Sequence, residues 1–143
     1  MLIKDIMTRH VECVSPENTV QDAARKMRDL DVGPMPVCDN GRLAGMLTDR
    51  DIAVRVVAEG QDPKASKVRD VMTPGVIYCF EDQNVEEAAR MMREHQVRRI
   101  LVLDRNKRLT GIVSLGDLAV DAGDRKQAGD TVKAVSEPAE PRR

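Results

Sequence analysis

The chain has 143 residues, of which 41% are apolar and 33% charged, as is usual for one compact globular domain or two very small ones. With one Tyr, one Phe and no Trp, it cannot stack a series of bases as single-stranded nucleic-acid binders do. Its 23 Lys and Arg against 24 Asp and Glu leave a net charge of −1, without the basic excess that duplex binding needs, so we expect no nucleic-acid partner.

The sequence contains no membrane signal. No apolar run approaches the roughly 20 residues that cross a bilayer. Residues 1–5 carry charges where a secretory signal peptide has its apolar stretch. We therefore expect a soluble, cytoplasmic protein without membrane insertion.

The sequence is an internal duplication. Shifting it by 65 positions, or by 66 after one inserted residue near Asn106, aligns its first half with its second. The aligned pairs include residues 5–8 with 70–73, residues 23–25 with 88–90, Gly45 with Gly111, and Asp51 with Asp117. We expect one repeat at residues 1–62, a second at 63–121, and a C-terminal tail at 122–143.

Each repeat is predicted to begin with a short strand and a helix. Apolar runs at residues 11–14 and 76–79 predict the strands. Apolar residues at helical spacing then predict helices over residues 20–30 and 85–92.

A β-hairpin and a second helix complete each repeat. The hairpin strands are predicted at residues 35–38 and 43–47 in the first copy and at 100–103 and 109–113 in the second. Polar turns at residues 39–41 and 104–107 join them. The closing helices are predicted over residues 48–59, with Gly60 as the stop, and over residues 114–122.

Local signals also predict helix starts and the nature of the tail. Thr19 with Asp22, and Asn84 with Glu87, resemble N-terminal capping pairs. Residues 131–135 predict one amphipathic helix, and the rest of the tail is expected to be solvated.

The order strand, helix, strand, strand, helix predicts an α+β fold. A unit of about 60 residues is marginal alone, because it buries too little surface. Two copies solve this by covering each other's bare sheet faces. We therefore expect two tandem β-α-β-β-α repeats packed sheet to sheet with pseudo-two-fold symmetry.

Three cysteines lie far apart in the sequence. Cys13, Cys38 and Cys79 form no CxxC pair and have no His at ligand spacing, so we expect no metal site. The simplest interpretation is that each is a small apolar residue on a strand. A redox sensor is the alternative.

Each return strand ends in the pattern Gly-x-x-(Thr/Ser)-x-x-Asp, at residues 45–51 and 111–117. One interpretation is a helix cap, since Thr or Ser followed by an acidic residue three positions later is close to a capping box. The other is a nucleoside-phosphate site. A helix start offers free N–H groups and a hydroxyl to phosphate, the carboxylate accepts from ribose hydroxyls, and glycine allows close approach of a ligand.

The doubled opening at residues 5–8 and 70–73, the (Gly/Arg)-x-x-(Pro/Leu)-Val strand and the Gly-x-x-(Thr/Ser)-x-x-Asp ending together resemble a tandem pair of cystathionine-β-synthase (CBS) domains. The resemblance covers about residues 1–120 and is closest to stand-alone CBS proteins of prokaryotic type. It implies a Bateman module that binds AMP, ADP, ATP, NAD(H) or S-adenosylmethionine as a regulator, in clefts between the repeats. It implies no catalytic cofactor.

The resemblance also implies roles for individual residues. Thr48 and Ser114 would contact phosphate, and Asp51 and Asp117 would hold the ribose hydroxyls. Gly45 and Gly111 would let the ligand approach. Arg98 and Arg99 stand where the γ subunit of AMP-activated kinase has basic phosphate contacts; the alternative is a solvated pair flanking a strand.

The two copies differ in charge. Gly33 and Pro34 replace the arginine pair in the first copy. Asp49, beside the first motif, would repel phosphate, while Arg50 would offset it. If only one site binds a charged nucleotide, we expect it to be the second.

Two functions remain open. The first is a regulatory module that senses an adenosine ligand and modulates an unidentified partner protein. The second is a ligand-free structural or interaction domain. An enzyme is disfavoured because the repeats use nearly the whole sequence and because spacing gives neither His10 nor His95 a nucleophilic partner.

The first closing helix predicts a homodimer. Its apolar residues, among them Ile52, Val54 and Val57, occupy more than one face. Monomers rarely expose such a patch, and a two-fold contact would bury it. The alternative is that the tail, through Val132 and Val135, covers the patch within one chain.

Overall fold

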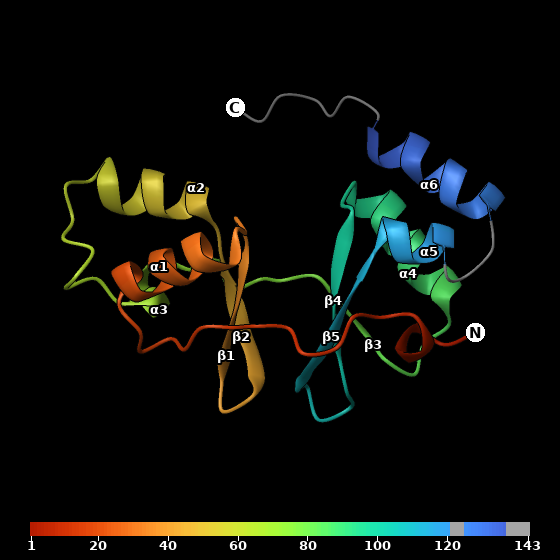
Figure 1. The fold of residues 1–143 in the computed structure, drawn as a ribbon, viewed down its shortest axis with the longest axis horizontal. Coiled ribbons are helices and arrows are strands. Elements are labelled where there is room, and N and C mark those ends of the chain that lie inside the picture. Colours follow the sequence, from red (N-terminus) through yellow and green to blue (C-terminus); the bar gives the residue numbers. More distant parts are fainter. Residues whose placement is uncertain (121–124, 137–143) are drawn as a thin grey trace. The chain divides into compact units, whose positions relative to one another are not determined.

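The computed structural model describes residues 1–120 and 125–136, and it divides into two compact units. One unit is formed by Glu12–Val76, the other by Met1–Val11 together with the described residues from Ile77 onward. Figure 1 shows a small sheet and several helices in each unit, which confirms the predicted α+β class. Among the described residues, no helix is both long and apolar enough to cross a membrane.

The unit of residues 12–76 is built on one hairpin. Strand β1 (Met35–Asp39) pairs antiparallel with β2 (Arg42–Leu47). Asn40 and Gly41 turn the chain with φ values of 51° and 83°, as an Asn-Gly hairpin turn requires. The helices are α1 (Val20–Leu30), α2 (Asp49–Ile52) and α3 (Val68–Val71).

The first closing helix is not one regular α-helix. After α2 the chain continues as η2 (Ala53–Val57), a π-helical turn in which the Ala58 N–H donates to the Ala53 carbonyl at 2.9 Å. Gly60, at a φ of 67°, ends it as predicted.

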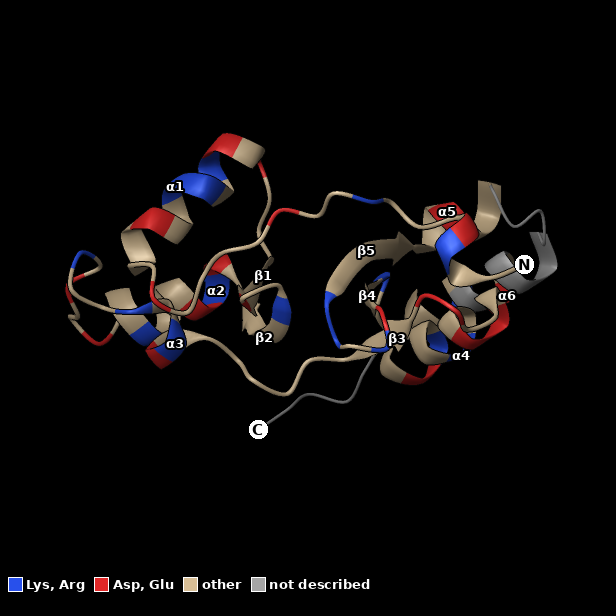
Figure 2. Ribbon diagram, turned by 90° about the horizontal axis from the view of Figure 1, so that it is seen from below, with Lys and Arg blue, Asp and Glu red and all other residues tan. Residues whose placement is uncertain are grey.

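The other unit contains a three-stranded sheet in the order β3-β4-β5. Its strands are β3 (Tyr78–Phe80), β4 (Arg99–Leu103) and β5 (Leu109–Ser114). Its helices are η1 (Ile3–Asp5), α4 (Val85–His95), α5 (Leu115–Val120) and α6 (Arg125–Ser136). Helices α4, α5 and α6 lie on one side of this sheet (Figures 1 and 2).

Two local predictions were wrong in part. The strand expected at residues 11–14 is reduced to a single parallel bridge between Val14 and Val37, because no neighbouring residue continues the ladder. Helix α6 starts six residues before the helix predicted at 131–135, and the Gln96 amide donates to the Ala134 carbonyl at 3.3 Å, which ties α6 to the end of α4. Residues 121–124 and 137–143, the rest of the tail, lie outside the described part.

Of the two helix caps predicted for α1 and α4, the first is confirmed and the second is formed differently. At α1 the predicted box is confirmed: the Asp22 N–H donates to Thr19 Oγ1 at 3.1 Å, and the Thr19 N–H to Asp22 Oδ2 at 3.3 Å. At α4, Asn84 caps the Glu86 N–H instead, and the Glu87 carboxylate pairs with Arg90. A guanidinium one turn along is a stronger partner for a carboxylate than a backbone N–H. Acidic and basic residues are mixed on both helices (Figure 2).

Each unit has its own aliphatic core, and each core includes the opening segment of the other repeat. Ile3, Ile6 and Met7 are buried with the residues of the second repeat. Val68 and Val71 are buried with those of the first. The compact units therefore do not share the limits of the sequence repeats, and the limits 1–62 and 63–121 remain a prediction.

Candidate functional site

Both Gly-x-x-(Thr/Ser)-x-x-Asp turns form capping boxes. The Asp51 N–H donates to Thr48 Oγ1 and the Thr48 N–H to Asp51 Oδ2, each at 3.0 Å. The Asp117 N–H donates to Ser114 Oγ at 3.1 Å, and the Ser114 N–H to Asp117 Oδ2 at 2.8 Å. The capping interpretation is thus confirmed at both turns. It uses one carboxylate oxygen of each Asp, so the Oδ1 atoms lie outside the cap.

The glycine of each motif lies in close contact with a backbone carbonyl group of another segment. A Cβ on Gly45 would lie 2.8 Å from the Thr73 carbonyl oxygen, and a Cβ on Gly111 would lie 2.8 Å from that of Thr8. Such distances are essentially never seen for real Cβ atoms. The two glycines therefore have a packing role here, and the approach of a ligand to them remains a prediction.

The repeated segments 5–8 and 70–73 cause this close approach. Thr73 pairs with Met46, the residue after Gly45, through hydrogen bonds of 2.8 and 2.9 Å. Thr8 pairs in the same way with Ile112, through bonds of 2.9 and 3.0 Å. Both threonines are exposed. Neither threonine was predicted as a site residue, although their duplication is visible in the sequence.

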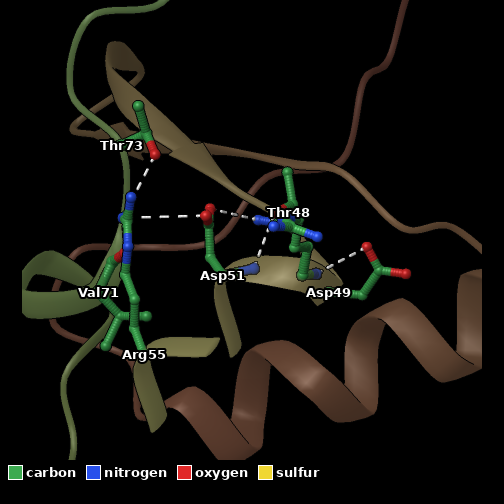
Figure 3. A network of polar contacts seen from close by, with 7 residues as sticks. Thr48, Asp49, Asp51, Arg55, Val71 and Thr73 are labelled. Carbon is green, nitrogen blue, oxygen red and sulfur yellow. Dashed lines mark hydrogen bonds and ion pairs between the residues drawn. The ribbon is translucent and has the colours of Figure 1, made fainter. Parts of the chain in front are cut away.

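Arg55 is a further site residue that the sequence analysis missed. Its Nη1 donates to the Val71 carbonyl at 2.6 Å and to Thr73 Oγ1 at 3.3 Å, and it lies 3.8 Å from Asp51 Oδ1 (Figure 3). Arg55 thus joins the capping box to the segment that follows α3. The signal was its position one helical turn after Asp51.

The role predicted for Arg50 at the first site remains a prediction. Arg50 is exposed, and its backbone N–H donates to Asp49 Oδ1 at 3.0 Å. The side chain that forms an ion pair with Asp51 is Arg55 (Figure 3).

The two turns differ most in the residue that precedes the hairpin. In the first, the Asp49 carboxylate lies against Gly33, so that a Cβ there would be 3.2 Å from Asp49 Oδ1. In the second, Arg98 takes the place of Gly33, and its carbonyl accepts from the Leu115 N–H at 2.9 Å. At the first turn, a side chain at the position of Gly33 would therefore face the Asp49 carboxylate. At the second turn, the same position carries the Arg98 guanidinium.

Arg98 and Arg99 are brought together at the Ser114 end of the sheet. Arg99 lies opposite Ser114 in the β4–β5 register. Both arginines are exposed, and neither forms an ion pair with the side chains that the structure describes. The second turn therefore combines a hydroxyl, a carboxylate and two cationic side chains.

The CBS domain family model matches residues 3–58 and 68–120, which include both turns. The chain belongs to the CBS domain family. The match to two successive domains also confirms the tandem pair that the duplication predicted.

Two bacterial relatives are similar to this CBS pair over most of their length. The CBS domain-containing protein YhcV of Bacillus subtilis is 42% identical over 134 residues, which are 94% of each chain. Hypoxic response protein 1 of Mycobacterium tuberculosis is 40% identical over 117 residues, which are 81% of each.

Solved structures of CBS proteins share the fold. A crystal structure of Hypoxic Response Protein I with two coordinated zinc ions has a TM-score of 0.73 at 39% identity, over 83% of this chain and 97% of that one. CBSX2 in complex with AMP has a TM-score of 0.71 at 28% identity, over 87% and 98%. The CBS domain pair of MJ0100, in complex with 5′-methylthioadenosine and S-adenosyl-L-methionine, has a TM-score of 0.67 at 27% identity, over 83% and 97%.

In the described part of this chain, no three His, Cys, Asp or Glu side chains gather closely enough to hold a metal ion.

Proposed function

We propose that this CBS pair is a regulatory module that binds an adenosine-containing ligand at its two Gly-x-x-(Thr/Ser)-x-x-Asp turns and modulates a partner protein. The observation that carries the proposal is that both turns hold a hydroxyl and a carboxylate in the same geometry, with one carboxylate oxygen outside the cap. The complexes of CBSX2 with AMP and of MJ0100 with S-adenosyl-L-methionine support this class of ligand.

The ribose would bind to the carboxylate oxygen that the cap leaves unused at each turn. A carboxylate accepts hydrogen bonds only, which suits the two adjacent hydroxyl donors of a ribose. At the first turn Asp51 Oδ1 faces Arg55 at 3.8 Å, and the Asp51 side chain is 15% exposed. Ribose binding there requires Arg55 to share or release Asp51.

The phosphate would bind preferentially at the second turn. Arg98 and Arg99 flank Ser114 and supply charge-assisted hydrogen-bond donors. The first turn instead presents the Asp49 carboxylate beside Gly33, which repels phosphate. We therefore expect two unequal sites, with Thr48, Asp51 and Gly45 at the weaker and Ser114, Asp117 and Gly111 at the stronger.

The decisive experiment removes both carboxylates. After a thermal-shift screen of AMP, ADP, ATP, NAD and S-adenosylmethionine has chosen the ligand, calorimetry compares wild type with the Asp51→Ala, Asp117→Ala double variant. Loss of a hydrogen bond to a charged group costs about 1.5–3 kcal/mol, so affinity should fall about 10- to 100-fold at each site. Unchanged affinity in a folded double variant would refute the assignment.

Helix α1 provides a matched control. Its Thr19–Asp22 box has the same two hydrogen bonds but lies outside both proposed sites. Asp22→Ala should lose a cap worth about 1 kcal/mol and leave ligand affinity unchanged. If it weakens the ligand as much as Asp51→Ala does, the effect of the latter is only loss of a cap.

The second candidate is a ligand-free structural or interaction pair. It is favoured by the capping boxes themselves, which account for Thr48, Asp51, Ser114 and Asp117 without any ligand. A thermal-shift screen in which no adenosine ligand moves the melting temperature would select it. Neither candidate assigns a catalytic residue.

The proposed partners include a second copy of the chain. Val54 and Val57 on η2 are 49% and 70% exposed. Helix α6, which the alternative needs as their cover, contains Val135, which is partly buried against the core that α4 and α5 help to form. A two-fold contact through η2 would bury the exposed valines of both copies.

A further inference from the structure

Two of the three cysteines meet in the unit of residues 12–76. Val14 and Val37 form a parallel bridge in which the Val14 N–H donates to Pro36 at 3.0 Å and the Cys38 N–H donates to Val14 at 2.9 Å. Cys13 directly precedes this bridge on one segment, and Cys38 directly follows it on the other. The Cys13 thiol lies close enough to the Cys38 thiol to contribute, after burial, to the raised pKa of Cys38.

The two thiols differ in accessibility. Cys13 is partly exposed, whereas Cys38 is 6% exposed in the core of its unit. An oxidant from solvent therefore reaches Cys13 first, with Cys38 next to it.

The pair is not a by-product of the duplication. At the shift of 65 positions, Cys13 and Cys38 correspond to Tyr78 and Leu103. The third cysteine, Cys79, corresponds to Val14; it is 1% exposed, and its thiol donates to the Leu101 carbonyl at 3.7 Å. Cys79 is thus a buried thiol without a cysteine partner in the described chain, and it serves as an internal control.

We propose that Cys13 and Cys38 are an oxidation site at which hydrogen peroxide forms a reversible disulfide. The Cys13 sulfur attacks the peroxide, so that an S–O bond forms, the O–O bond breaks and one water leaves. The Cys38 sulfur then attacks the Cys13 sulfur, the S–S bond forms, the S–O bond breaks and a second water leaves. Two thiols lose two electrons and two protons in all, and one hydrogen peroxide is reduced to two waters.

The environment of Cys38 sets the pH dependence of the second step. Burial, with a contribution from nearby Cys13, raises the pKa of the Cys38 thiol to about 12. Since the thiolate is the nucleophile, closure of the disulfide should be slow at neutral pH and faster as the pH rises.

The disulfide would join the start of the unit of residues 12–76 to strand β1. The chain passes between the units at Val11 and Glu12, and Cys13 follows at once. Bridging Cys13 to β1 closes a loop in the unfolded chain, which raises the melting temperature of the oxidised protein by at least about 5 °C.

The test is thiol counting and peptide mapping after treatment with hydrogen peroxide. In denaturant, titratable thiols should fall from three to one in wild type. They should fall from two to none in the Cys79→Val control, and Cys13→Ser should form no disulfide. Non-reducing tryptic maps should link residues 10–25 to residues 29–42, and dithiothreitol should separate them.

Three results would overturn the proposal. The first is peroxide converting Cys13 to sulfinic acid in folded wild type without any 10–25 to 29–42 cross-link. The second is a cross-link between two chains in place of the internal one, seen as a dimer on a non-reducing gel. The third is a cross-link that survives in Cys13→Ser, which keeps the buried Cys38 and so should fold.

Discussion

Replacing Gly111 by Ala tests whether segment 5–8 is a built-in part of the unit that contains β5. The new Cβ would lie 2.8 Å from the Thr8 carbonyl oxygen and 2.7 Å from Met7 Sδ. The same carbonyl accepts from the Ile112 N–H at 3.0 Å, and the Thr8 N–H donates back at 2.9 Å. Overpacking costs about 1–3 kcal/mol and each of the two weakened hydrogen bonds about 0.5–1.5 kcal/mol, so we expect about 2–6 kcal/mol of destabilisation.

Urea unfolding followed by Tyr78 fluorescence measures this change. Tyr78 is the only tyrosine, the chain has no Trp, and β3 belongs to the same unit as Gly111. The matched control is Gly116→Ala, whose Cβ would have its nearest neighbour, Ser114 Oγ, at 3.6 Å. Because Gly116 lies in α5, Ala should stabilise the helix by about 0.5–1 kcal/mol. An unchanged urea midpoint for Gly111→Ala would show that segment 5–8 moves aside without cost.

Three further outcomes are expected. Reversing both Arg98 and Arg99 to Glu should weaken AMP at least about tenfold in calorimetry but adenosine less than about twofold; equal losses would contradict a phosphate contact. Val57→Asp should halve the mass seen by light scattering, from twice 15.9 kDa to 15.9 kDa, and an unchanged mass would place any dimer contact elsewhere. The hydrogen bond from Arg105 lowers the pKa of Asp82. The ionised Asp82 therefore stabilises the folded protein above the ordinary pKa of Asp, and this stabilisation is lost as the pH falls through the lowered pKa. In Arg105→Gln, NMR titration should show the pKa of Asp82 rising toward its ordinary value, and no rise would contradict this cause.

The sequence predicted what short-range signals determine. Helix α1 follows from apolar spacing and the Thr19–Asp22 box, and the hairpin turn follows from Asn40 and Gly41. At the candidate site, the same local logic placed Thr48 and Ser114 at helix starts.

Contacts between distant segments were beyond that logic. Nothing local to Gly45 shows that Thr73 covers it, and nothing local to Arg55 shows that its guanidinium reaches the Val71 carbonyl. The meeting of Cys13 and Cys38 depends on the bridge at Val14, which is too short to give a strand pattern. Such contacts depend on which distant segments pack into the same core, and the order of residues along the sequence does not show this.

The exchange of opening segments bears on how this gene arose. A fragment of residues 1–62 lacks Val68, Val71 and the Thr73 backbone that complete its core and cover Gly45. It retains residues 1–11, which have no place in that unit. In a dimer of such a single-repeat ancestor, the first residues of each copy would complete the core of the other copy, as in a domain-swapped dimer. Joining the two chains end to end then turns a concentration-dependent association into an intramolecular one.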